Sequence, residues 1–216
     1  MKSSSKIAWI IAILFVCNQP FVAAQTRHAI PDSVMQNITF LGMDFSQAKY
    51  IGPPSQHKGV PEFTNDEFRE RYTTAWNRLF IDEPKKYNVA KMVLRPSVKY
   101  ALDVTEKANA GIKKEFSGYS ASEFATLDVK KIIDLVSAYD FQGRTGTGLI
   151  FFVEGMNKDL REAGAWVTLV DMSTKKVLST TYATGKSGGW GFRNYWANSW
   201  LIIMKKTEAD FRNFKN

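Results

Sequence analysis

Cys17 is the only cysteine in this 216-residue chain, and it lies in an N-terminal segment that has the features of an export signal. Lys2 and Lys6 give a positively charged start, an apolar run covers residues 7–16, and small residues at 22–24 provide a signal peptidase site. We expect cleavage between Ala24 and Gln25, which leaves a mature chain without cysteine. That chain can form neither a disulfide nor a thiolate metal site, so its fold must depend on a hydrophobic core.

Two other interpretations of the N-terminus fit its sequence less well. A membrane anchor requires roughly 20 apolar residues, about twice the length of the run over residues 7–16. A lipoprotein would carry its lipid on Cys17, but the residue before such a cysteine is normally small, whereas Val16 is branched and bulky. The sequence therefore predicts a periplasmic or secreted protein with no transmembrane segment in the mature chain.

The mature chain is moderately basic. The whole sequence has 29 Lys and Arg against 21 Asp and Glu, and two of the lysines lie in the export signal, which leaves a formal charge of +6. Such an excess favours anionic partners, among them lipid headgroups, cell-wall polymers and acidic glycans. Because the excess is modest, it is more typical of a charge that only maintains solubility. No nucleic-acid motif is present, so nucleic acid is not expected as a partner.

The sequence after the signal predicts one α/β (α+β) domain over residues 25–216, with helices packed on a single mixed β-sheet. Residues 25–36 are polar and predict a loose arm, residues 52–61 are a loop rich in proline and glycine, and residues 106–126 are irregular. Apolar patterns predict strands at residues 38–45, 97–105, 149–153, 166–172 and 177–184, the last two forming a hairpin. Helices are predicted after Thr64 and at residues 84–92, 128–139 and 194–214.

The helix after Thr64 has the clearest local signals. Thr64 and Glu67 have the spacing of a capping box, and Phe63 and Phe68 stand at the positions of a hydrophobic staple. The apolar stripe of this helix consists of Phe68, Tyr72, Trp76 and Leu79. Asp128 is expected to cap the helix that follows it.

Short motifs for catalysis or cofactor binding are incomplete. Residues 185–189 match G-x-S-x-G, but the hydrolases that use this motif need a histidine after the serine, and His28 and His57 both precede it. A phosphate-binding loop would need glycine where Thr180 stands. The glycines of residues 143–148 precede a strand rather than a helix, the wrong order for a dinucleotide site. The two histidines lack metal-ligand spacing. The sequence therefore predicts no metal and no cofactor.

Several carboxylates lie near predicted strand ends. Asp44 is close to the end of the first strand, Glu154 ends the strand at residues 149–153, and Asp159 and Glu162 follow it. Two such acids brought within roughly 5–10 Å could perform glycoside hydrolysis. Acids at strand ends are also commonly only solvated.

Residues 185–200 combine aromatic side chains, glycines and cations. Trp196, Trp200 and Ile203 share one face of the predicted last helix and are expected in the core. The candidate ligand-binding residues are those that precede or begin this helix: Lys186, Trp190, Phe192 and Arg193. Aromatic faces beside cations suit a sugar or an acidic peptide. The alternative is a glycine-rich turn whose aromatic side chains cap the core.

The last third of the chain resembles a known type of domain. Asp171, Thr174 and Val177 stand where an acid-x-x-Thr-x-x-Val pattern occurs in the closing hairpin of envelope domains of the curli-secretion and TolB N-terminal type. The segment from Gly185 to Trp196 is similar to segments of secreted proteins of Gram-negative gut and oral bacteria. These resemblances imply an α/β domain and an envelope role, and they supply no catalytic residue.

The sequence thus favours an exported, non-enzymatic envelope protein that binds a protein or an anionic glycan. The alternative is a hydrolase of an envelope polymer that uses Asp44, Glu154 or Asp159. A third hypothesis is a subunit of a larger envelope assembly, which would show an exposed apolar patch around Trp190 and Phe192. Oligomeric state and pathway have no signal in the sequence.

Overall fold

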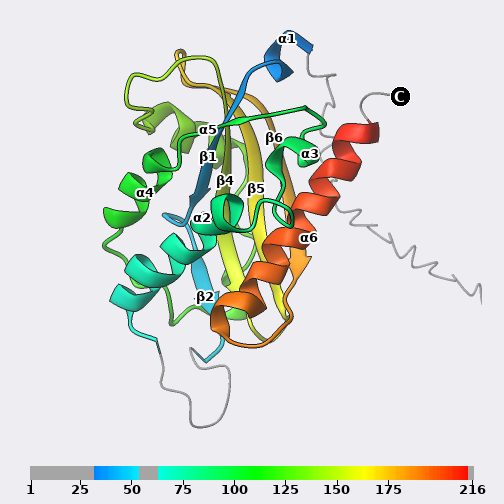
Figure 1. Cartoon of the computed structure of the whole chain (residues 1–216). Helices are drawn as coiled ribbons and strands as arrows, with labels where there is room; N and C mark the ends of the chain where they lie inside the picture. The colour runs from blue at the N-terminus through cyan, green and yellow to red at the C-terminus, as the bar shows by residue number, and fades with distance from the viewer. Residues whose placement is uncertain (1–31, 54–62, 214–216) are drawn as a thin grey trace, which may run out of the picture.

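The computed structural model describes residues 32–53 and 63–213. The predicted export signal, Cys17, both histidines and most of the proline-rich loop lie outside the described residues. The described part is an α/β domain built on one mixed sheet, as the sequence predicted (Figure 1). No helix among the described residues is long and apolar enough to cross a membrane.

The sheet runs in the order β3-β1-β4-β5-β6. Strand β1 (Ile38–Asp44) is parallel both to β3 (Lys99–Tyr100) and to β4 (Thr147–Asn157). Strand β2 (Lys49–Ile51) adds a short parallel pairing to the end of β4. Strands β5 (Glu162–Asp171) and β6 (Lys176–Lys186) complete the sheet as an antiparallel meander, which confirms the predicted hairpin.

One face of the sheet is covered by η1 (Glu67–Tyr72), a π-helical segment, and by α2 (Thr73–Asp82), α3 (Val89–Met92) and the long α6 (Phe192–Asn213). The predicted capping box is present, because the Thr64 amide donates to Glu67 Oε2 at 3.3 Å and the Glu67 amide donates to Thr64 Oγ1 at 3.1 Å. Trp76, Trp196 and Trp200 are fully buried between these helices and the sheet. The expectation that the last helix buries its tryptophans is therefore confirmed.

The other face carries a smaller core beneath α5 (Val129–Ala138). The Lys131 amide donates to Asp128 Oδ1 at 2.7 Å, which confirms Asp128 as the helix cap. Ile132 and Val136 are buried under this helix, whereas the neighbouring Ile133 is about half exposed. The short 3-10 turn η2 (Ala121–Glu123) precedes α5.

Polar side chains take the place of a strand along the outer edge of β1. Strand β3 pairs with β1 only at Thr39 and Phe40. Beyond that point, Asn77 from α2 bonds both backbone groups of Met43, at 2.7 and 2.9 Å. Further bonds come from α4 (Asp103–Ala110), where Thr105 donates to the Leu41 carbonyl and Asn109 donates to the Met43 carbonyl and accepts from the Phe45 amide. The backbone of β1 is thus satisfied without a neighbouring strand.

Four local predictions were wrong in whole or in part. The strand expected at residues 97–105 consists only of Lys99–Tyr100, because α4 begins at Asp103 and its polar side chains complete the edge of β1. Part of the irregular stretch expected at 106–126 belongs to the same helix. The helix expected at 84–92 is limited to α3, which Asn88 caps through the Lys91 amide at 2.8 Å. The N-terminal arm contains a short helix, α1 (Asp32–Met35), and Met35 is buried in the main core.

Candidate functional site

Two connections meet at the end of the sheet where β4 and β6 finish, the lower end in Figure 1. The turn at residues 158–161 joins β4 to β5, and residues 187–191 join β6 to α6. The Ser187 amide donates to the Arg161 carbonyl at 2.8 Å, and Lys186 Nζ donates to the Leu160 carbonyl at 3.3 Å. These bonds hold the two connections side by side.

Trp190 is the most exposed large apolar side chain of this end, with 85% of its surface accessible. Its loop is nevertheless fixed, because the Gly188 amide donates to the Tyr195 carbonyl at 2.9 Å. Gly189 and Gly191 adopt φ angles of 104° and 80°, which only glycine adopts readily. The glycines on either side of Trp190 therefore shape a turn that presents the indole ring to solvent.

The other three predicted ligand-binding residues have internal partners. Phe192 is partly buried, with its ring centroid 4.6 Å from Tyr72 and 4.9 Å from Phe63. Arg193 pairs with Glu83 at 2.9 Å. Lys186, although mostly exposed, pairs with Glu162 at 2.9 Å. Of the four residues, Trp190 is thus the one whose side chain is presented to solvent without an internal role.

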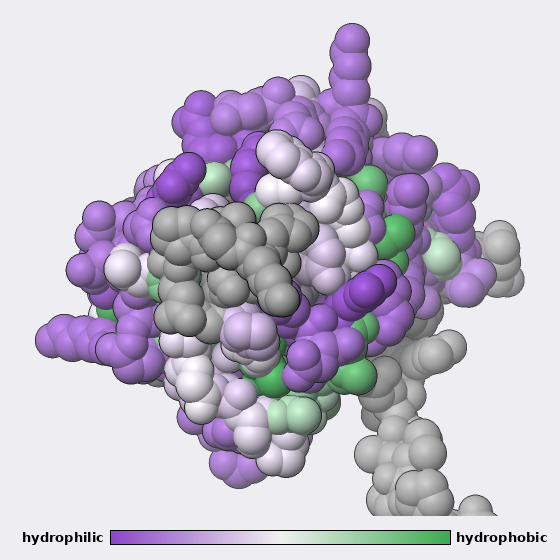
Figure 2. Space-filling model, turned by 90° about the horizontal axis from the view of Figure 1, so that it is seen from below, coloured by the Kyte–Doolittle hydropathy of each residue, from purple (hydrophilic) through white to green (hydrophobic). Residues whose placement is uncertain are grey.

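The structure adds three residues of the β4–β5 turn that the sequence did not single out. Leu160 is 53% exposed, and Lys158 and Arg161 flank it. Neither of these two cations forms an ion pair with any other described residue. We call the group formed by Lys158, Leu160, Arg161 and Trp190 the loop-end patch. Viewed from this end, the molecule shows weakly polar and apolar surface within a mainly hydrophilic surround (Figure 2).

The carboxylates proposed for hydrolysis do not line a common open cleft. Asp44 is opposite Phe152 in the register of β1 and β4, and Glu154 lies two residues further along β4. Both are only 1% exposed. Glu154 accepts hydrogen bonds from the Leu127 amide at 2.5 Å and from Trp166 Nε1 at 3.0 Å, so both of its oxygens have partners. Asp159 lies on the exposed β4–β5 turn. This arrangement gives no support to a pair of acids acting on a bound polymer.

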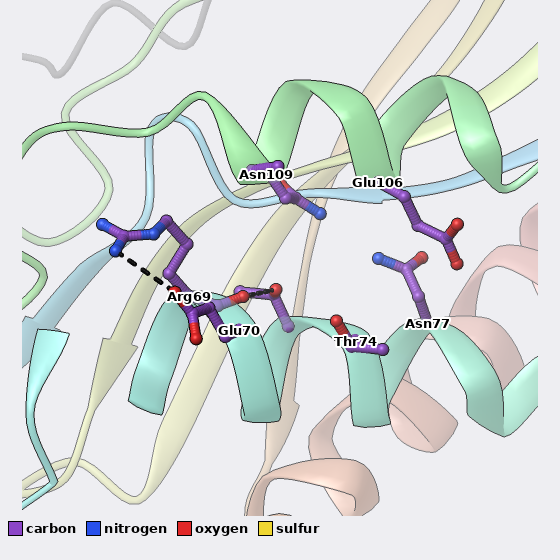
Figure 3. A pocket seen from close by; sticks show the side chains of 8 residues that line it. Arg69, Glu70, Thr74, Asn77, Glu106 and Asn109 are labelled. Atoms are coloured by element: carbon purple, nitrogen blue, oxygen red, sulfur yellow. Dashed lines mark hydrogen bonds and ion pairs between the residues drawn. The ribbon is translucent and has the colours of Figure 1, made fainter. Parts of the chain in front are cut away.

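A hollow of about 240 Å³ separates η1 and α2 from α4 (Figure 3). Asn77 and Asn109 reach into it from the two opposite sides, and both amides hold the backbone of β1. Arg69 pairs with Asp66 and Glu70 and donates to the Ile112 carbonyl at 3.2 Å. Because its principal polar groups already have partners, we interpret this hollow as a gap in the packing between helices and not as a ligand site.

A larger hollow, of about 530 Å³, opens where β1 ends, between α4 and the residues that follow α5. Ser46, Lys114 and Tyr139 line it, and Asp44 lies directly behind Ser46 and Tyr139. Burial raises the pKa of Asp44, although the hydrogen bond from Ser46 opposes this. Burial and the nearby Lys49 lower the pKa of Lys114 to about 8.

Among the described residues, no group of three or more histidine, cysteine, aspartate or glutamate side chains could hold a metal ion. No protein-family model matches the chain, and no curated protein matches its sequence. The resemblance to curli-secretion and TolB N-terminal domains therefore stays a prediction.

Proposed function

We propose that this chain is an exported protein of the bacterial envelope that binds an acidic glycan through the loop-end patch and performs no catalysis. The observation that carries the proposal is the 85% exposure of Trp190 on a turn fixed by backbone hydrogen bonds. A large aromatic side chain presented to water on a fixed backbone turn is suited to stacking on a sugar ring. Because the backbone of the turn is already fixed, binding does not have to order it.

The charges around Trp190 support an acidic glycan over a neutral one. Lys158 and Arg161 lie on the neighbouring turn and have no ion-pair partner among the residues described. Cations without an ion-pair partner can pair with carboxylate or sulfate groups of a polymer, and arginine can do so in bidentate geometry. The net charge of +6 expected for the mature chain would also draw the protein toward an anionic polymer.

The energy available from Trp190 is sufficient for a measurable effect. Stacking that removes roughly 100 Å² of indole surface from water contributes about 2.5 kcal/mol at 25 cal/mol per Å². Loss of this contribution weakens binding more than tenfold.

The test measures binding of the mature chain to polygalacturonate and to uncharged dextran by isothermal titration calorimetry. We expect binding to polygalacturonate that weakens as salt is raised, and at least tenfold weaker binding in Trp190→Ala. Ile133→Ala is the matched control, because Ile133 is an exposed apolar residue of α5, away from the loop-end patch. Equal effects of the two substitutions, or a lack of binding to polygalacturonate, would contradict the proposal.

A further inference from the structure

The hollow at the end of β1 has the position and the lining of a ligand site. It lies beyond the carboxyl end of a strand that is parallel to both of its neighbours, where open α/β sheets generally bind ligands. Its volume of about 530 Å³ is within the usual range for small-molecule sites. Val104, Ala108 and Ile112 supply apolar wall, and Ser46, Lys114 and Tyr139 supply polar groups.

Two buried polar atoms at the inner wall have no hydrogen-bond partner of good geometry. The Ser46 amide donates to Asp44 Oδ1 at 2.6 Å. Asp44 Oδ2 and the Tyr139 hydroxyl are both buried, and the two groups interact with each other, although their geometry falls outside that of a good hydrogen bond. The Tyr139 ring is held by Phe141 and Phe152, at centroid distances of 5.2 and 5.8 Å. The inner wall therefore holds a buried carboxyl and a buried phenol that lie close together.

The charge of the hollow is positive. Lys113 and Lys114 line it, and neither forms an ion pair with a described residue. Lys107 at the rim is neutralised by Asp140 at 2.8 Å. Lys49 approaches from β2 and raises the positive potential at Lys114. Asp44 lies behind the wall and attracts Lys114, but its burial disfavours the charged form of the acid.

We propose that this hollow binds a small organic acid, whose carboxylate pairs with Lys114 and Lys113 and whose apolar part lies against Val104, Ala108 and Ile112. Ser46 and Tyr139 line the polar end of the hollow, with Asp44 behind them. The site shares no residue with the loop-end patch, and the inference does not depend on the proposed function.

The experiment titrates the mature chain with sodium hexanoate and follows binding by calorimetry and by the midpoint of thermal unfolding. Hexanoate is expected to bind and to raise the midpoint, whereas hexylamine at the same concentration leaves it unchanged. Lys114→Met is expected to weaken hexanoate binding at least tenfold, and Lys114→Arg to retain most of it. Lys131→Met is the control, because Lys131 is an exposed lysine on α5 outside the hollow.

The pH dependence gives a second readout. Lys114 binds the carboxylate only when protonated, so affinity for hexanoate is expected to fall as the pH rises through about 8. Lys113, Lys107, Lys49, Asp44, Asp140 and Tyr139 are the other titratable groups around it. Lys114→Met should flatten this dependence, and Lys131→Met should not. Equal binding of hexanoate and hexylamine, equal losses in Lys114→Met and Lys131→Met, or no binding of hexanoate would overturn the proposal.

Discussion

Replacing Gly42 with alanine tests how the edge of β1 is completed. Gly42 has φ of +99°, and an added Cβ would lie 2.5 Å from both Asn77 Oδ1 and Thr105 Oγ1. The left-handed backbone costs an alanine about 1–2 kcal/mol. Displacing the two side chains would also leave the Met43 amide and the Leu41 carbonyl without their bonds, at about 1–3 kcal/mol each. We therefore expect a loss of about 3–8 kcal/mol.

Gly118→Ala separates these contributions, because Gly118 has φ of +89° and no atom within 4 Å of its added Cβ. This control should lose only the backbone part, about 1–2 kcal/mol. The assay is urea unfolding followed by tryptophan fluorescence and by circular dichroism. Similar losses in Gly42→Ala and Gly118→Ala would refute the reasoning, because the side-chain bonds to β1 would then contribute little.

Three further predictions concern residues with defined surroundings. Burial raises the pKa of Asp44 above 3.8, so the folded state favours the protonated acid, and wild-type stability should fall as the pH rises through the raised value. Asp44→Asn should abolish that fall in pH-dependent urea unfolding, and an unchanged pH profile would contradict a buried, titrating carboxyl. Asp128→Ala should cost about 1 kcal/mol of unfolding free energy through loss of the α5 cap, and no measurable change would contradict that role. In thermal unfolding, Phe192→Ala should destabilise by about 1–3 kcal/mol, whereas Trp190→Ala should stay within about 0.5 kcal/mol of wild type; equal effects would contradict their different burial.

The sequence correctly predicted the helix starts that depend only on residues close together in the chain. The capping box at Thr64 and Glu67 and the cap at Asp128 each act over three residues, and each is present in the structure. The segment around Lys99–Tyr100 could not be predicted in this way. Its alternating apolar residues fit a strand, but it pairs with β1 at only two positions. Beyond them, the backbone groups of β1 are bonded by the side chains of Asn77, Thr105 and Asn109.

The candidate sites, too, depend on contacts between distant segments that the sequence could not predict. The sequence identified residues 185–200 as unusual, but it could not show that Trp190 is exposed while Phe192 packs against Tyr72. That difference depends on where α6 lies on the sheet. The hollow at the end of β1 draws its polar lining from three segments that are far apart in the chain. The sequence singled out only Asp44, which lies behind this lining.

The central claim, binding through the loop-end patch, is tested most directly by acrylamide quenching of tryptophan fluorescence in the mature chain. Trp76, Trp166, Trp196 and Trp200 are buried, so Trp190 is the one mature tryptophan open to the quencher. We predict that polygalacturonate protects Trp190 from acrylamide and that dextran does not. Unchanged quenching at polygalacturonate concentrations that saturate binding would place the contact elsewhere on the protein and contradict the claim.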